Sequence, residues 1–172
     1  MEPKKVLVIG SAGKIFSDAV TVDIDPEHHP DVVHDLNVTP WPFPDNSFQE
    51  IVAHHVVEHL QDFASAMKEM YRICSKDGCV YIEVPHHTAW FAKDPAHKMF
   101  FGYFSFDGFI AGKTGWVTGR KFRCLKREIT FHKFYRALFL HRLFNRWPLT
   151  YERFWCYNFP AEHVKIWLSP EK

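Results

Sequence analysis

The sequence predicts an α/β fold: a doubly wound, mostly parallel Rossmann-like sheet that ends in a C-terminal antiparallel hairpin. Two apolar runs, about Lys5–Ile9 and Val20–Ile24, lie on either side of a short glycine-containing turn. Continuous apolar runs are typical of parallel strands that are buried on both faces. Strand and helix patterns then alternate along the chain, and two strand patterns close it, which indicates this fold class.

The middle of the chain continues this alternation. Its further strands are expected at Asp31–Val33, Glu50–His54 and Cys79–Val84. Asp62 is placed to cap a helix that runs to about Cys74, because apolar residues recur there at helical spacing. Gly78 lies just past the expected end of this helix, and Pro85 ends the strand that follows.

The last third of the chain is less regular. Residues 86–119 predict an irregular insertion with short helices. Lys121–Phe131 alternates enough to form a strand, and Phe134–Trp147 predicts one helix that Pro148 stops. Glu162–Leu168 alternates polar and apolar residues, as an edge strand or the final strand of a hairpin does.

The first connection is unusually short. Only ten residues, Gly10 to Ala19, separate the first two strands, whereas a parallel crossover usually needs about a dozen or more. The first helix is therefore expected to be shortened or absent. The whole chain, residues 1–172, has the length of a single domain.

Several short motifs follow the glycine turn, which reads GSAG and so lacks the spacing of a dinucleotide-binding G-x-G-x-x-G turn. They are VDID, HDL, PFPDNSF, EIVAHHVVEHL, YRICSKDG and VYIEVP. Together they resemble the class I S-adenosylmethionine (SAM) dependent methyltransferases, in particular the small type 11 methyltransferase-domain group, over roughly residues 5–107. The resemblance implies SAM as cofactor and transfer of its methyl group to an acceptor, which we expect to be a small molecule.

The resemblance also implies a cofactor site. The amino-acid part of SAM is expected at the turn, the ribose at Asp23 with Asp25 in reserve, the adenine at Asp35, and the methionine side at the end of the fourth strand. The residues expected to bind the cofactor are Gly10, Ser11, Ala12, Gly13, Asp23, Ile24, Asp35, Leu36, His54 and His55. Ala12 stands where the group usually has a second glycine, and alanine tolerates a positive φ poorly.

The segment after the fifth strand, about residues 86–119, is expected to cover the acceptor as a lid. Histidine has a pKa near neutrality and can take a proton from an attacking alcohol, phenol or amine. We therefore predict His87 and His97 as candidate general bases, with Asp94 as a group that orients one of them. His59, with Glu58, is expected either at the mouth of the acceptor site or as part of a helix start. Methyl transfer can also proceed by proximity and alignment without a strong base.

The string from His55 to His59 also spells H-x-x-E-H, the inverted zinc-peptidase motif. In a helix, His55 and His59 would share one face and could bind zinc as a hydrolase does. The motif follows directly on a strand, however, and no long helix is predicted to hold it. We therefore expect no metal site. A further alternative is a non-catalytic SAM- or nucleoside-binding module, which Ala12 and the short first connection suggest.

Composition limits the remaining classes. Apolar residues make up 47% of the chain and aromatic residues 17%, which excludes a disordered protein. The 17 Phe and 6 Trp fit either an aromatic core or an aromatic pocket for a flat, apolar acceptor, and the same two interpretations apply to Phe100–Phe106. No membrane span or signal peptide is evident, and four cysteines without C-x-x-C spacing indicate a reducing compartment. We therefore expect a cytoplasmic protein.

Charge is distributed unevenly. Residues 1–111 carry a net charge of −8 and residues 112–172 a net charge of +9. The two parts can attract each other within one fold, or the basic part can meet an anionic partner; we expect no nucleic acid. Residues 133–147 are basic and amphipathic, so this segment either packs its apolar stripe on the sheet edge or contacts a membrane surface. The sequence does not indicate an oligomeric state.

Overall fold

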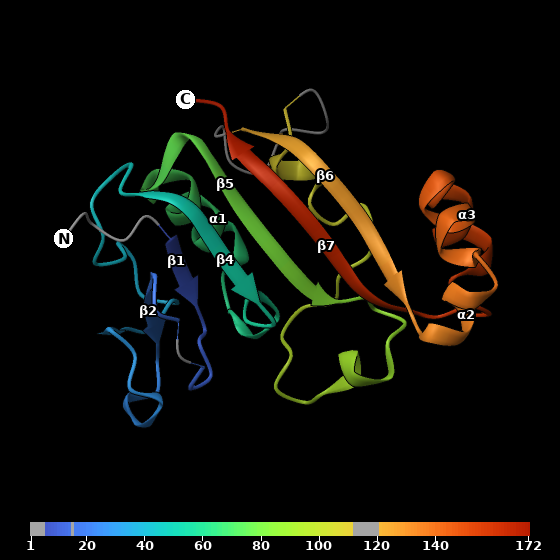
Figure 1. Ribbon diagram of the computed structural model, residues 1–172, viewed down its shortest axis with the longest axis horizontal. Helices are drawn as coiled ribbons and strands as arrows, with labels where there is room; N and C mark the ends of the chain where they lie inside the picture. Colours follow the sequence, from blue (N-terminus) through green and yellow to red (C-terminus); the bar gives the residue numbers. More distant parts are fainter. Residues whose placement is uncertain (1–5, 15, 112–120) are drawn as a thin grey trace.

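The computed structural model describes residues 6–14, 16–111 and 121–172, and its centre is one seven-stranded mixed sheet (Figure 1). In spatial order its strands are β3 (Val32–Val33), β2 (Ala19–Asp23), β1 (Val6–Ile9), β4 (Phe48–His54), β5 (Cys74–Pro85), β7 (Ala161–Pro170) and β6 (Phe122–Phe131). The first five pair in parallel, whereas β7 pairs antiparallel with both β5 and β6. The predicted fold class is confirmed.

The helices are few and short. The α-helices are α1 (Phe63–Ile73), α2 (Lys133–Ala137), α3 (Leu140–Arg146) and α4 (Pro148–Thr150). Single turns occur at η1 (Pro26–His28), η2 (Val57–His59), η3 (Trp90–Lys93), η4 (Asp107–Phe109) and the π-helical η5 (Tyr151–Trp155). None of the helices in the described part of the chain has the length and apolarity that crossing a membrane requires.

Helix α1 forms where the sequence predicts it. Asp62 caps it, accepting a hydrogen bond on Oδ1 from the Ser65 N–H at 3.0 Å. Its apolar stripe, which includes Met67, Met70 and Ile73, is buried in the main hydrophobic cluster. That cluster also contains the inward-facing residues of the central strands, so burial of one helix face fixes α1 against the sheet. The chain passes directly from α1 into β5, and Gly78 lies within this strand.

The predicted single helix over Phe134–Trp147 is wrong. The segment forms two helices, α2 and α3, because Phe139 between them adopts a left-handed conformation with φ 57°. A residue in that conformation cannot continue a right-handed helix. Pro148 ends α3, as expected, but it also occupies the first turn of α4, a position where proline loses no hydrogen bond.

The other C-terminal predictions hold in part. The strand expected at Glu162–Leu168 is the middle strand of the antiparallel end of the sheet, with partners on both sides, rather than an edge strand. The predicted insertion contains the single turns η3 and η4 over its described residues, 86–111, and a bridge between His86 and Phe101. Residues 112–119 of the insertion lie outside the described part of the chain.

The first connection has no helix in its described residues, 10–14 and 16–18. Three of its residues have positive φ angles: 69° at Gly10, 47° at Ala12 and 74° at Gly13. Gly10 also meets a close neighbour, since a Cβ there would lie 2.7 Å from Cγ2 of Val56. Gly10 is therefore required both by its conformation and by packing.

We expect the substitution Gly10→Ala to lower the free energy of unfolding by about 2 kcal/mol, because it adds a strained φ and a steric clash. Gly13→Ala is the matched control: its φ is similar, but the nearest atom, Cδ2 of His28, is at an ordinary 3.7 Å. It is expected to cost only about 1 kcal/mol. Chemical denaturation measures both. Equal losses in the two variants would show that packing against Val56 contributes nothing.

Candidate active site

The predicted cofactor residues follow the carboxyl ends of adjacent parallel strands. The strand order reverses between β1 and β4, and open α/β sheets bind ligands in the crevice at such a reversal. The turn Gly10–Gly13 follows β1, Asp23 ends β2 and Asp35 follows β3. His54 and His55 lie at the end of β4. The sheet topology thus brings these predicted residues to one edge.

The carboxylate of Asp23 holds the glycine turn in place. Its Oδ2 accepts hydrogen bonds from the Ala12 N–H at 2.9 Å and the Ser11 hydroxyl at 3.4 Å, and lies 3.3 Å from Nδ1 of His28. Its Oδ1 accepts the Asp25 N–H at 3.1 Å. Burial alone would raise the pKa of Asp23, but the hydrogen bonds from Asp25, Ala12 and His28 outweigh it and lower the pKa. Asp23 is therefore an ionised acceptor that shapes the turn.

The residues predicted at the adenine differ in exposure. Ile24 is 63% exposed next to the buried Asp23, so it offers an apolar surface at the edge of the sheet. Leu36, in contrast, is buried in the core, and its carbonyl accepts the indole N–H of Trp41. Asp35 accepts two hydrogen bonds from Asn37 on Oδ1. Within the described residues, its Oδ2 has no hydrogen-bond partner.

A second group of polar residues surrounds Glu83 near the end of β5. Its carboxylate lies 3.1 Å from Nε2 of His54, 3.1 Å from Nζ of Lys165 and 3.9 Å from Nδ1 of His163, and it accepts the hydroxyl of Tyr81. Burial alone would raise the pKa of Glu83, yet its bonds with Tyr81 and Lys165 and the nearby His54 lower it. Burial lowers the pKa of His54 and of His163.

His55 and Glu58 form a pair beside this group. Nδ1 of His55 lies 3.2 Å from Oε1 of Glu58, whose side chain is 1% exposed. His55 has a φ of 52°, an unusual conformation for a residue with a side chain, which the surrounding contacts must hold. Oε2 of Glu58 is buried and has no hydrogen-bond partner among the described residues.

The helix that an inverted zinc-peptidase motif needs does not form. The motif lies partly on the single turn η2, so His55 and His59 are not one helical turn apart on a common face. The two histidines of the motif also have different partners. His55 pairs with Glu58, whereas His59 faces the lid segment through the carbonyl of Ala96, 3.3 Å from its Nδ1. The zinc-hydrolase alternative is therefore wrong in its structural premise.

The predicted lid histidines fall into two separate places. His97 lies against His59, with ring centroids 4.7 Å apart, and its Nδ1 is 3.1 Å from the carbonyl of Ala92. The carboxylate of Asp94 accepts the N–H of Ala96 at 2.8 Å and so stabilises a turn. Within the described residues it forms no hydrogen bond or ion pair with the ring of His97. Its proposed orienting role has no support in this geometry.

His87 belongs to a different network, which Glu152 organises. The carboxylate of Glu152 lies 3.2 Å from Nε2 of His87 and 3.1 Å from Nε2 of the fully buried His86, and it accepts the N–H of Tyr103. Burial would raise the pKa of Glu152, but these hydrogen bonds lower it far below its usual value. The network connects η5 to the end of β5 and to the lid.

In the part of the chain that the structure describes, three groups of side chains bring possible metal ligands within 4.8 Å of one another: His54, His55 and Glu83; Glu58, His59 and His97; and His86, His87 and Glu152. In the first, Lys165 already neutralises Glu83. In the third, the carboxylate is shared by two imidazoles and a backbone N–H. Only the second retains a buried carboxylate oxygen without a partner.

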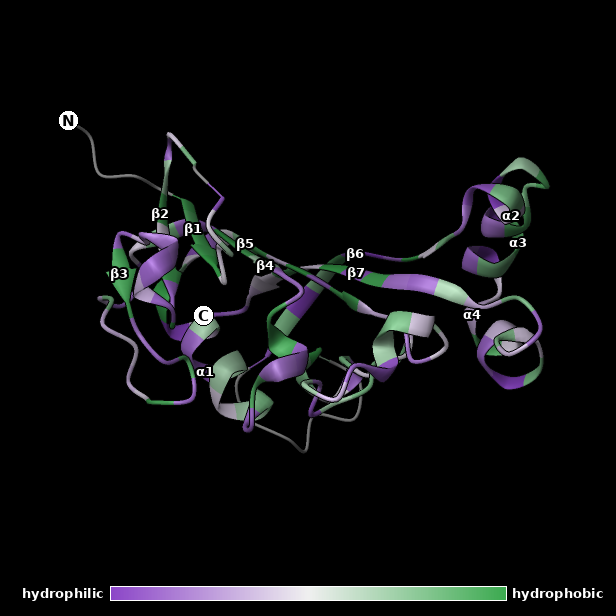
Figure 2. Cartoon of the chain, turned by 90° about the horizontal axis from the view of Figure 1, so that it is seen from below, coloured by the Kyte–Doolittle hydropathy of each residue, from purple (hydrophilic) through white to green (hydrophobic). Residues whose placement is uncertain are grey.

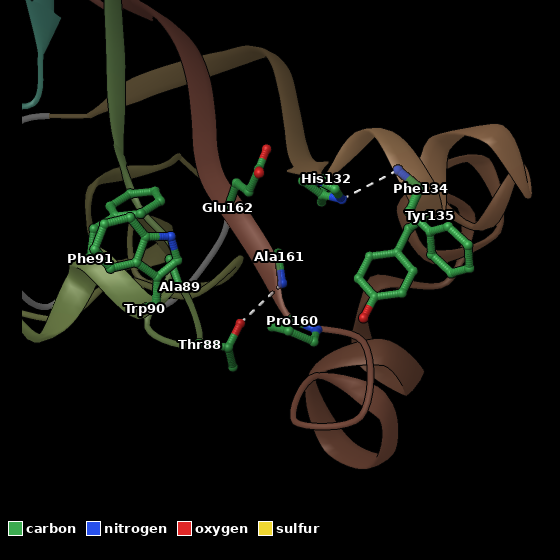
Figure 3. A pocket seen from close by; sticks show the side chains of 10 residues that line it. All are labelled: Thr88, Ala89, Trp90, Phe91, His132, Phe134, Tyr135, Pro160, Ala161 and Glu162. Atoms are coloured by element: carbon green, nitrogen blue, oxygen red, sulfur yellow. Dashed lines mark hydrogen bonds between the residues drawn. The ribbon is translucent and has the colours of Figure 1, made fainter.

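An apolar pocket of about 580 Å³ opens between the lid and α2 (Figure 3). Figure 3 shows Trp90 and Phe91 on one side, Phe134 and Tyr135 on the other, and Pro160 at the start of β7 between them. Its lining consists of Thr88, Ala89, Trp90, Phe91, His132, Phe134, Tyr135, Pro160, Ala161 and Glu162. The ring of Phe91 also contacts His163 at 5.3 Å and His55 at 6.2 Å between centroids. The pocket therefore adjoins the histidines at the carboxyl edge.

Sequence reasoning missed Glu83, His163 and Glu152. Glu83 carried a signal, since it is the one charged residue in the apolar run of the fifth strand. The sequence does not indicate a role for His163 or Glu152, because their partners lie far away along the chain. Glu152, for example, pairs with His86, which is 66 residues earlier in the sequence.

Comparison with known proteins shows one family match over part of the chain and structural matches over most of it. The family model described as "Methyltransferase domain" matches residues 8–82. No curated protein sequence matches the chain.

Solved structures share the fold over nearly the whole chain. A SAM-dependent methyltransferase from Archaeoglobus fulgidus has a TM-score of 0.63 and 18% identity, with 95% of this chain and 84% of that chain covered. One from Mesorhizobium loti has a TM-score of 0.59 and 13% identity, covering 95% and 90%. A putative methyltransferase in complex with the Haloferax volcanii activator Trm112 has a TM-score of 0.60 and 12% identity, covering 96% and 82%.

Proposed function

We propose that this chain is a class I SAM-dependent methyltransferase, which the partial family match and the shared fold support, and that it methylates a small acceptor with an apolar body. The observation that carries the proposal is the aromatic pocket, because Phe91 both lines it and contacts His55 and His163. An acceptor with a flat or apolar body fits such walls. Its reactive atom would lie at the histidine end, where the carboxyl edge of the sheet begins.

The residues at the edge fit SAM, whose sulfonium supplies an already activated methyl group. The backbone turn Gly10–Gly13, with three positive φ angles, would hold the amino-acid part. Ile24 presents the exposed apolar surface that an adenine ring packs on, and the spare oxygen of Asp35 can accept from its amino group. Asp23 would receive a ribose hydroxyl on Oδ1, which among the described residues accepts only the Asp25 N–H.

Proton removal is best assigned to the pair His55–Glu58. Glu58 accepts from Nδ1 of His55 and so leaves Nε2 of that ring with its lone pair. This nitrogen belongs to the histidine that contacts Phe91 of the pocket. His87 is held by Glu152 and His97 by the carbonyl of Ala92. We therefore propose that these two position the lid, while His55 takes the proton of an acceptor hydroxyl or amine.

The direct test is transfer of radiolabelled methyl from SAM to a panel of phenols, amines and thiols of graded apolar size. We expect turnover with aromatic acceptors and competition between acceptors for one site. Phe91→Ala should raise KM for the acceptor without changing the affinity for S-adenosylhomocysteine. Cofactor binding without turnover on any acceptor class would instead support a non-catalytic binding module.

Asp23→Ala should weaken binding of S-adenosylhomocysteine at least tenfold. The variant loses the ribose acceptor and also the bonds that hold Ser11 and Ala12, and each charge-assisted hydrogen bond is worth about 1.5–3 kcal/mol before compensation. Calorimetry measures the affinity, and circular dichroism checks that the variant is folded. Asp25→Ala is the control, since its carboxylate mainly caps η1. Unchanged affinity in a folded Asp23→Ala protein would remove Asp23 from the site.

A further inference from the structure

The segment between β6 and β7, residues 133–157, leaves most of its large apolar side chains uncovered. We call it the C-terminal arm. Figure 2 shows its helices at the end of the molecule opposite β3, and its inward side is anchored by the buried Phe144 and Tyr151. Its outward apolar residues are 43–82% exposed: Phe134, Leu138, Phe139, Leu143, Trp147, Leu149, Phe154, Trp155 and Tyr157. The expectation that residues 133–147 pack their apolar stripe on the sheet edge is therefore wrong for most of that stripe.

The same arm is strongly basic. Its cationic residues, all exposed, are Lys133, Arg136, Arg142, Arg146 and Arg153. Among the described residues, none of them forms an ion pair with a carboxylate, and Arg142 lies over the ring of Phe139 at 5.2 Å. The one acidic residue of the arm, Glu152, points inward to His86 and His87. The exposed side of the arm thus combines aromatic and aliphatic side chains with positive charge and has no acidic group.

We propose that the C-terminal arm docks on an anionic membrane surface. Short helices that present Trp, Phe and Leu together with Arg and Lys are suited to the interface between lipid headgroups and acyl chains, where aromatic rings partition and cations meet lipid phosphates. A symmetric contact between two copies through this face would place five cations of one copy opposite five of the other, and their repulsion disfavours such a dimer. A water-exposed role leaves unexplained why nine large apolar side chains gather there.

The acceptor pocket lies next to this surface. Phe134, which is 61% exposed, belongs to both the arm and the pocket lining, and Tyr135 follows it in α2. Docking of the arm would therefore bring the mouth of the pocket to the headgroup region. Membrane docking itself does not depend on the chemistry carried out in the pocket, so it can be tested without SAM and without an acceptor.

The test is co-sedimentation of the full chain with large unilamellar vesicles of phosphatidylcholine alone or mixed with phosphatidylglycerol, at low and high salt. We expect binding to the mixed vesicles that weakens as salt rises. The double variant Arg142→Gln/Arg146→Gln should bind at least tenfold more weakly, since each basic residue near an anionic surface strengthens binding about fivefold and two do so about 25-fold. The control Lys68→Gln/Lys76→Gln removes the same charge elsewhere and should bind like the wild type.

The apolar contribution is tested by Leu138→Gln, with Val38→Gln as control, since both side chains are similarly exposed. Only Leu138→Gln should weaken vesicle binding severalfold. No binding to the mixed vesicles at low salt would overturn the proposal, as would equal losses in arm and control variants. Light scattering without vesicles completes the test: an oligomer that Arg142→Gln/Arg146→Gln converts to monomer would identify the arm as a protein interface instead.

Discussion

Replacing Glu152 with Ala is expected to lower the free energy of unfolding by about 3–5 kcal/mol, the usual cost of removing one partner from a buried polar network. The carboxylate is bonded to His86, to His87 and to the N–H of Tyr103. His86 is completely buried, so water cannot replace the lost acceptor without entering the core. Three elements that are distant in sequence would lose their common contact.

Denaturant unfolding measures this loss, and the control is Glu128→Ala. Glu128 pairs with Lys126 at 2.8 Å, but both side chains reach solvent, and exposed pairs contribute at most about 1 kcal/mol. Glu152→Gln should fall between the two variants, because an amide retains one acceptor oxygen but adds a donor. If Glu152→Ala were as stable as Glu128→Ala, the network would have no structural role.

The low pKa of Glu152 also predicts how the free energy of unfolding changes with pH. Its folded pKa lies below the unfolded value of a carboxyl, so its contribution to stability is fully present above about pH 4.3 and is lost as the pH falls below that. The buried His86 acts in the same direction from a higher pH, because burial lowers its pKa and the unfolded chain takes up its proton first. Glu152→Ala should therefore show a shallower loss of stability in acid than the wild type.

Local patterns were enough to predict the parallel part of the fold. Strands β1, β2 and β4 are apolar runs whose neighbours supply turn residues, and Asp62 caps α1 where the helical spacing begins. The prediction of one C-terminal helix was wrong because a single backbone angle determines whether that helix continues. Phe139 divides the expected helix, and no residue type at that position signals a positive φ.

The candidate site could be predicted only for polar residues that directly follow a predicted strand in the sequence. His54 and His55 are adjacent in sequence to the end of β4, so topology alone places them at the edge. His163 reaches the same region from β7, which crosses in the opposite direction, and the sequence does not fix that register. The partners of His87 and His97 also depend on long-range contacts, so their presence in one lid segment did not imply one site.

The substitution His55→Asn should lower kcat about 10²-fold with any acceptor whose proton must be removed, the usual loss when a general base is deleted. Asparagine accepts a positive φ more readily than other side chains, so the variant retains the backbone at φ 52°. Affinity for S-adenosylhomocysteine should change much less than kcat. A loss of kcat confined to acceptors that must give up a proton would identify the missing group as a base rather than as a wall of the pocket.

Glu58→Gln and His97→Asn separate the role of the pair from that of the lid. Glu58→Gln leaves the ring of His55 in place but removes the carboxylate that holds its Nδ1 proton, so kcat should fall less than in His55→Asn. His97→Asn breaks the contact with His59 on the other side of Glu58 and should alter KM more than kcat. A full loss of kcat in His97→Asn combined with normal turnover in His55→Asn would move the base from the end of β4 to the lid. Only a nitrogen that reaches the acceptor can cause such a loss of rate.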